Sequence, residues 1–245
     1  MARAGRIVAE THRLVGEHVR PGVTTQELDE LAEQYIRSQG GVPTFLGYKG
    51  FPASLCLSPN DMVVHGIPGP YELREGDILS VDVGVTLDGF VADAAFTHPV
   101  GAVSQDATRL LEVGQAALAA GVAQARAGNR LSDISHAVQS VTEAAGFSVI
   151  RSLVGHGVGR SMHEDPQIPN FGAPGRGPLL QPGMTLAIEP MINAGGPDVY
   201  LHDDHWSIST EDGSLSCHFE HTVAVTESGP RILTEANHLP VRQAV

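Results

Sequence analysis

The sequence is poor in cysteine and lysine, and each scarcity argues against a class of chemistry. Its two cysteines, Cys56 and Cys217, lie far apart and form no CxxC pair. This argues against a disulfide framework and favours free thiols in a cytoplasmic protein. Lys49 is the only lysine among the 15 basic residues, which leaves little scope for a Schiff base formed on a lysine amine.

The sequence also lacks long apolar runs. No segment approaches the length needed to span a membrane, and the first residues have no apolar core typical of a signal peptide. A net charge of −13 disfavours nucleic-acid binding, which normally needs a basic surface. With 42% hydrophobic and 18% charged residues, the 245-residue chain is expected to form a packed core in one or two domains.

Two segments of similar pattern, 22–40 and 128–146, run between glycines that have the same separation. Both predict a helix. Thr24 or Thr25 caps the first, with Glu27 completing a capping box, and Ser132 caps the second. Another helical pattern precedes each segment. Two unrelated amphipathic helices would give this pattern by coincidence; the alternative is a duplicated domain whose halves close around a shared site.

After each helix pair the pattern changes to strands. Segments 77–87 and 90–96 are rich in β-forming residues and flank Asp88-Gly89, a strong two-residue hairpin turn. Segments 183–188 and 214–226 also predict strands. No linker divides the chain, so we expect one α+β domain over residues 1–245, with an antiparallel sheet and helices packed on one face.

The predicted hairpin brings two aspartates together. If Asp88-Gly89 is the turn, Gly84 pairs with Asp93, and Asp82 points to the same face because it lies two residues from Gly84. Asp82 and Asp93 are then diagonal neighbours with Cβ atoms within roughly 8 Å. Two like charges in an apolar sheet are costly without compensation, which a metal would supply. The alternative is a rim position for one carboxylate, or a bulge between them.

A glycine-rich segment, 155–166, contains two histidines. It does not match a dinucleotide fingerprint, because Arg160 stands where the third glycine belongs. It does not match an HExxH helix either, since Gln167 replaces the second histidine and Pro166 would disrupt the helix. Glycines on both sides of His156 instead indicate close approach of the backbone to a site.

Two further carboxylates follow or lie within apolar strands. Glu189 ends an apolar run and Glu220 lies in segment 217–225, and each signal is weak alone. With the two aspartates and His156 they form an oxygen-rich set that suits Mn, Fe(II), Co(II) or Zn. Bridging carboxylates in such a set could hold two divalent ions about 3.5 Å apart and activate a water between them. The sequence contains no GxSxG elbow for a serine hydrolase.

These residues resemble the type I methionine aminopeptidases, which have the pita-bread metallopeptidase fold. The resemblance runs from about Ile7 to Thr234 and implies pseudo-two-fold duplicated halves. It rests on specific motifs: Gly47-Tyr48-Lys49-Gly50-Phe51-Pro52, Val64-His65-Gly66-Ile67-Pro68, 76–82, 88–93, 156–166, 183–191 and Glu220-His221-Thr222.

The resemblance also implies a metal set. Asp82 would bind one ion, Asp93 and Glu220 would bridge, and His156 and Glu189 would complete the other. Glu189 would in addition move the proton of the attacking water, first as general base and then as acid.

The remaining implied roles concern the substrate. His163 would hydrogen bond near the scissile carbonyl and stabilise developing negative charge, and His65 would contact the amide on the leaving side. An unbranched thioether suits a closed apolar pocket. The methionine pocket would be lined by Phe45, Tyr48, Phe51, Cys56, Met162 and Trp206.

The sequence departs from the family in small ways. Phe51 and Met162 occupy positions where tyrosine and phenylalanine are frequent, which bears on the size of the pocket. The zinc-finger extension of eukaryotic type I members and the insertion of type II members, expected between His163 and Glu189, are both absent, which favours a minimal bacterial-type enzyme.

Three other readings remain. An X-Pro aminopeptidase or prolidase shares the fold, but its usual extra N-terminal domain has no room before His65. A binding protein that lost catalysis should have lost ligands, and a nucleic-acid module is opposed by the charge balance. We therefore expect a monomeric cytoplasmic enzyme that acts on the N-termini of nascent polypeptides. It would encounter the ribosome transiently and bind neither membranes nor specific nucleic acids.

Overall fold

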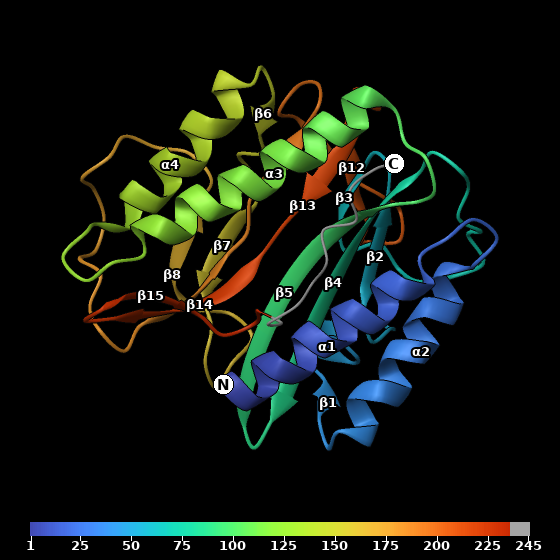
Figure 1. Ribbon diagram of the computed structural model, residues 1–245, viewed down its shortest axis with the longest axis horizontal. Coiled ribbons are helices and arrows are strands. Elements are labelled where there is room, and N and C mark those ends of the chain that lie inside the picture. Colours follow the sequence, from blue (N-terminus) through green and yellow to red (C-terminus); the bar gives the residue numbers. More distant parts are fainter. Residues whose placement is uncertain (236–245) are drawn as a thin grey trace.

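Two helices begin the chain and pack on the long hairpin that follows. The computed structural model describes residues 1–235, and Figure 1 shows α1 (Ala2–His18) lying across β4 (Ile78–Leu87) and β5 (Phe90–Pro99), with α2 (Thr25–Ser38) beside α1. The predicted cap of α2 is confirmed: Thr24 accepts from Glu27 N, and Glu27 Oε2 accepts from Thr24 N at 2.7 Å.

A second helix pair, α3 (Gln105–Gln124) and α4 (Leu131–Ala144), covers the other half. The prediction that Ser132 caps α4 is wrong, because the helix begins at Leu131 with Arg130 as its N-cap, two residues earlier than predicted. Asp133 Oδ2 accepts from Arg130 N at 2.8 Å, and Ser132 Oγ instead accepts from Arg176 N. A carboxylate in the first turn satisfies the free amide and complements the helix dipole.

The strands of the first half surround the hairpin. β4 pairs with β1 (Val42–Pro43), β2 (Cys56–Pro59) and β5, and a short 3-10 turn, η1 (Tyr48–Gly50), lies between β1 and β2. β3 (Met62–Val64) joins β11 (Val199–Leu201) and β12 (Ile208–Thr210) from the second half. The two halves of the chain therefore share a sheet as well as a site.

The second half contributes two further sheets. One has the order β15-β14-β9-β7-β8, formed by β7 (Val154–Gly157), β8 (Glu164–Pro169), β9 (Thr185–Ile188), β14 (His221–Thr226) and β15 (Gly229–Ile232). The other is β13-β10-β6, formed by β6 (Ser148–Val149), β10 (Met191–Asn193) and β13 (Ser216–His218). Every strand pair among residues 1–235 is antiparallel, as predicted.

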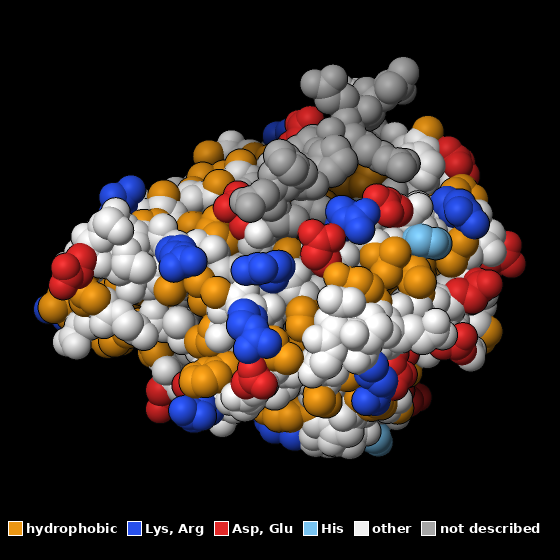
Figure 2. All heavy atoms as spheres, turned by 60° about the horizontal axis from the view of Figure 1, so that its bottom comes forward, with side chains coloured by type: hydrophobic (Ala, Val, Ile, Leu, Met, Phe, Trp, Pro, Cys, Tyr) orange, Lys and Arg blue, Asp and Glu red, His pale blue; other side chains and the backbone are white. Residues whose placement is uncertain are grey.

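The apolar core has one large cluster in each half. α1 and α2 bury Val8, Leu28 and Ile36 against β4, whereas α3 and α4 bury Leu110 and Ile134 against the second set of strands. This burial removes apolar surface from water in each half separately, which fixes each helix pair on its own strands. None of the helices within residues 1–235 is long and apolar enough to cross a membrane. On the face drawn in Figure 2, basic and acidic side chains are interspersed.

Candidate metal centre

The hairpin register places Asp82 and Asp93 as predicted. Asp88 and Gly89 form the turn with φ of 51° and 75°, Leu87 pairs with Phe90, and Gly84 pairs with Asp93. Positive φ at both central residues is characteristic of the hairpin turn that matches strand twist. Asp82 lies opposite Ala95 and also pairs with Cys56 of β2. Both aspartates are buried in the centre of the sheet.

The second half supplies His156, Glu189 and Glu220 from three separate places. His156 lies in β7, Glu189 follows β9, and Glu220 lies in the short gap between β13 and β14. The segment predicted as strand over 214–226 is thus divided, because β13 and β14 belong to different sheets. At this break the backbone N–H of Glu220 takes no part in strand pairing and donates instead to Ala95 O at 2.8 Å.

Glycines allow β7 to approach its neighbours closely. A Cβ at Gly155 would meet the carbonyl oxygen of Ala187 in β9, and one at Gly157 would meet the carbonyl oxygen of Asp165. Only glycine fits at such close backbone contacts. The ladder between β7 and β8 shifts register between His156 and Gly157. The glycines beside His156 therefore allow β7 to lie close to the neighbouring backbone, as the sequence indicated.

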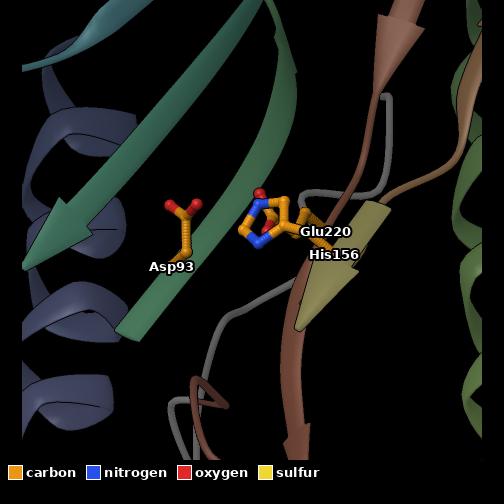
Figure 3. Close-up of side chains that lie close together, drawn as sticks. All are labelled: Asp93, His156 and Glu220. Carbon is orange, nitrogen blue, oxygen red and sulfur yellow. The ribbon is translucent and has the colours of Figure 1, made fainter. Parts of the chain in front are cut away.

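Three of these side chains converge. Asp93, His156 and Glu220 each offer a ligand atom, and these atoms all lie within 4.8 Å of one another. Figure 3 shows Asp93 extending from β5 toward His156 and Glu220, which come from the opposite half. Glu189 lies beside them, with Oε1 at 3.5 Å from His156 Nε2 and Oε2 at 3.4 Å from His218 Nε2.

The carboxylates are buried without enough partners. Asp82 Oδ1, Asp93 Oδ1 and Glu220 Oε1 have no hydrogen bond within the described part of the chain. Burial raises the pKa of Asp82 and of Glu189 to about 7, and burial with repulsion from the neighbouring carboxylates raises the pKa values of Asp93 and Glu220 well above their usual range.

Buried carboxylates without partners are costly, and a divalent cation is the partner that would satisfy several of them together. Oxygen and imidazole donors suit Mn, Fe(II), Co(II) and Zn. The residues present therefore fit a divalent metal.

A cavity of about 170 Å³ opens beside this cluster. Its apolar wall includes Phe51 and Trp206, whose rings meet edge to face at 5.1 Å. Gly84 makes room for Phe45, since a Cβ there would lie 2.8 Å from the Phe45 ring. All thirteen residues predicted for the site line this cavity: Phe45, Tyr48, Phe51, Cys56, His65, Asp82, Asp93, His156, Met162, His163, Glu189, Trp206 and Glu220.

Two histidines of the cavity are held neutral. Burial lowers the pKa of His65 to about 4, and burial together with the nearby His156 lowers the pKa of His163 to about 4. His65 also has a φ of 60°, an uncommon value for a residue with a side chain, and such conformations concentrate at functional sites. His163 Nδ1 lies 2.9 Å from the Tyr48 hydroxyl.

The sequence did not identify two residues near the centre. Lys49 also lines the cavity, on the exposed side of η1, and has a φ of 50°. His218 is buried and reaches Glu189, although only its position two residues before Glu220 hinted at this placement. No pattern in the sequence indicates that a single exposed lysine lines a cavity.

Comparisons with known proteins agree with this geometry. The family model described as metallopeptidase family M24 matches residues 1–227. A methionine aminopeptidase 1 of Bacillus subtilis (strain 168) is 53% identical over 234 residues, which is 96% of this chain and 94% of the relative. A methionine aminopeptidase 1 of Mycobacterium tuberculosis is 50% identical over 241 residues, covering 96% and 91%.

Solved structures extend the likeness to the fold. The crystal structure of methionine aminopeptidase from Rickettsia prowazekii aligns with a TM-score of 0.94 at 44% identity, over 96% of this chain and 95% of that chain. These likenesses confirm the pita-bread fold with duplicated halves. A prolidase from Pyrococcus furiosus, at 19% identity and a TM-score of 0.77, shares the fold alone, and this chain covers 63% of it.

Proposed function

The chain belongs to metallopeptidase family M24, with the type I methionine aminopeptidases as its relatives, and from this premise we propose the reaction of its cavity. The enzyme hydrolyses the first peptide bond of proteins and peptides and releases their N-terminal methionine when the second residue is small. One observation carries the proposal: Asp93, His156 and Glu220 converge within 4.8 Å beside a small apolar cavity.

The family uses divalent metal, and we propose two ions of Co, Mn, Fe or Zn. Asp93 and Glu220 would each serve both ions, Asp82 would bind one, and His156 and Glu189 the other. Divalent cations in such a site supply Lewis acidity and a water nucleophile at neutral pH. The buried oxygens of Asp82, Asp93 and Glu220, which lack hydrogen bonds among residues 1–235, support this assignment.

Glu189 is proposed to move the proton. Its carboxylate lies at the edge of the centre, with Oε1 3.5 Å from His156 Nε2 and Oε2 3.4 Å from His218 Nε2. From there it takes the proton of the attacking water and gives it to the leaving amine, acting as general base and then as general acid. The Glu189 side chain is 12% exposed and lines the cavity, so it can reach substrate atoms there.

The cavity is proposed to select methionine. About 170 Å³ suits one side chain, and Phe45, Phe51 and Trp206 give it apolar and aromatic walls. A flexible, polarisable thioether packs well against aromatic rings. His65 and His163, both neutral, would donate hydrogen bonds to the amide on the leaving side and to the scissile carbonyl, respectively.

The setting of the reaction is also proposed. The enzyme acts as one domain in the cytoplasm on nascent N-termini, and its two buried free cysteines are consistent with a reducing compartment. A monomeric state and a transient encounter with the ribosome stay predictions.

The decisive experiment is hydrolysis of Met-Ala-Ser by metal-free protein titrated with Mn(II), Co(II), Fe(II) and Zn(II). Metal-dependent release of free methionine, with Ala-Pro-Ser left intact, supports the proposed function. Cleavage of Ala-Pro-Ser instead would assign the chain to the prolyl peptidases that share its fold. No cleavage of either peptide by metal-loaded protein would refute the aminopeptidase assignment.

A further inference from the structure

We propose that Tyr48 is a positioning residue whose hydroxyl holds the His163 ring with its proton on Nε2, facing the substrate carbonyl. The inference rests on the proposed function and deepens it, because it gives a pocket residue a second role in the chemical step. The two residues are 115 positions apart and come from different halves of the chain.

The contact has two components. The Tyr48 hydroxyl lies 2.9 Å from His163 Nδ1, and the two rings stack with centroids 5.5 Å apart and planes inclined by 18°. Within residues 1–235, neither ring nitrogen of His163 has another hydrogen-bond partner, and the Tyr48 hydroxyl has none besides His163. Tyr48 is therefore the one side chain of the described protein that can set the proton position of this imidazole.

Both partners are held by their own backbones. Tyr48 N donates to Phe45 O and Tyr48 O accepts from Phe51 N, each at 2.9 Å, which fixes the turn that carries the tyrosine. On the other side, Glu164 Oε1 accepts from Arg160 N at 2.7 Å and from Ser161 N at 2.8 Å, which closes the loop before His163. The hydrogen bond therefore joins two constrained loops, so it can orient a ring at low entropic cost.

The proposed role of His163 sets the direction of the hydrogen bond. A neutral imidazole carries a donor on one nitrogen and an acceptor on the other. Of the two directions that this contact allows, donation from the Tyr48 hydroxyl to Nδ1 is the one that leaves the imidazole proton on Nε2. An N–H aimed at the scissile carbonyl can stabilise developing negative charge, whereas a bare nitrogen there would repel it.

The ring of His163 also packs beside His156, with centroids 4.3 Å apart. A ring free to turn about its side-chain bonds would lose both this packing and its direction relative to the cavity. The stacking and the hydrogen bond to Tyr48 oppose this rotation together. Tyrosine is therefore favoured over phenylalanine at position 48 for a reason separate from lining the methionine pocket.

The kinetic test compares Tyr48→Phe with Tyr71→Phe. The first variant keeps the ring and the pocket wall but removes the hydroxyl; the second removes a hydroxyl that donates to Asp77 Oδ2 at 2.9 Å, outside the cavity. Tyr48→Phe should lower kcat for Met-Ala-Ser roughly tenfold with little change in KM, because one hydrogen bond that acts in the transition state is lost. Tyr71→Phe should leave both constants near wild type.

A double-mutant cycle separates positioning from a structural effect. If Tyr48 acts through His163, then Tyr48→Phe should cost nothing further in a His163→Ala background. The proposal would be overturned if Tyr48→Phe lowered kcat tenfold both in the wild type and in the His163→Ala variant. An unchanged kcat in the single variant Tyr48→Phe would also overturn it.

The proton position can be measured without substrate. Zinc-loaded protein labelled with ¹⁵N in its histidine rings should show His163 as the Nε2–H tautomer, assigned by the signal that disappears in His163→Ala. Tyr48→Phe should convert it to a mixture of tautomers. An Nδ1–H tautomer in the wild type would overturn the proposal even if Tyr48→Phe failed to fold. Failure of the wild type to cleave Met-Ala-Ser would instead refute the proposed function and leave this measurement interpretable.

Discussion

Thr222 exchanges two hydrogen bonds with the backbone of Asp93, 129 residues away. Its hydroxyl accepts from Asp93 N at 2.9 Å and donates to Asp93 O at 2.8 Å. These bonds use the backbone groups of Asp93 that point away from β4, so they join β14 of the second half to β5 of the first. The residue proposed to serve both metal ions is thus held at the junction of the two halves.

We expect Thr222→Val to lower the free energy of unfolding by about 2–6 kcal/mol. The valine has nearly the same shape, but it leaves a buried N–H and a buried C=O without partners, each costing about 1–3 kcal/mol. Thr222 is fully buried. Urea unfolding of metal-free protein measures the loss, with Thr226→Val as the matched control, because Thr226 lies near a turn and accessible solvent can replace its partners. Equal losses in the two variants would contradict the junction role.

Asp93→Ala and Glu220→Ala should each abolish metal loading and peptide hydrolysis. Each removes a ligand atom from the group that lies within 4.8 Å, and each is proposed to serve both ions. Metal content after dialysis and methionine release from Met-Ala-Ser measure the two effects. Asp106→Ala, an exposed carboxylate in the first turn of α3, should change neither. Near-normal turnover in either variant, with its metal content verified, would rule out the shared-ligand assignment.

The hairpin and its two aspartates could be predicted because a two-residue turn fixes the register of every residue that follows. The division of 214–226 could not, since β13 and β14 follow each other as largely buried strands and only their partners in different sheets reveal the break at Glu220. The start of α4 was misplaced for a local reason: the N-cap residue is Arg130, whose backbone N–H donates to Asp133, whereas Ser132 accepts from Arg176 N of a distant loop.

Sequence patterns do not predict contacts between loops that are distant in the chain. Tyr48 and His163 are each recognisable as part of a motif, but no periodicity or spacing indicates that their polar atoms meet. The same holds for His218 and Glu189, whose approach depends on how β13 and β9 end in space. The sequence motifs therefore predicted residues that line one cavity, whereas the hydrogen bonds between them required the fold.

Stabilisation by metal should increase with pH. In metal-free protein the folded-state pKa values of Asp82 and Glu189 are raised to about 7, so between about pH 4 and 7 the folded state binds more protons than the unfolded state. These two groups therefore favour folding at low pH, and their contribution is lost as pH rises through 7. A cation must displace those protons, so it binds better once they have left.

Thermal unfolding at one fixed Mn(II) concentration tests this linkage. The rise in Tm caused by Mn(II) should be small at pH 5.5 and clearly larger at pH 8. Comparing each sample with metal-free protein at the same pH cancels the titration of histidines remote from the centre. In Asp93→Ala the rise should be absent at both pH values. A rise that is the same at pH 5.5 and pH 8 in the wild type would show that proton release is not coupled to binding.

Gly16→Ala should destabilise the protein, although alanine normally stabilises a helix interior by about 0.5–1 kcal/mol relative to glycine. Gly16 lies within α1, where a Cβ would be 2.7 Å from Cε1 of His98, a ring that packs against Phe96 and buries its Nε2. Overpacking of this kind costs about 1–3 kcal/mol, so the clash outweighs the helix propensity.

Urea unfolding of Gly16→Ala should give a net loss of about 1 kcal/mol in the free energy of unfolding. In a His98→Ala background the sign should reverse, because the space is then open and only the propensity remains. Stabilisation by Gly16→Ala in the wild-type background would show that His98 moves aside freely and does not select glycine at this position.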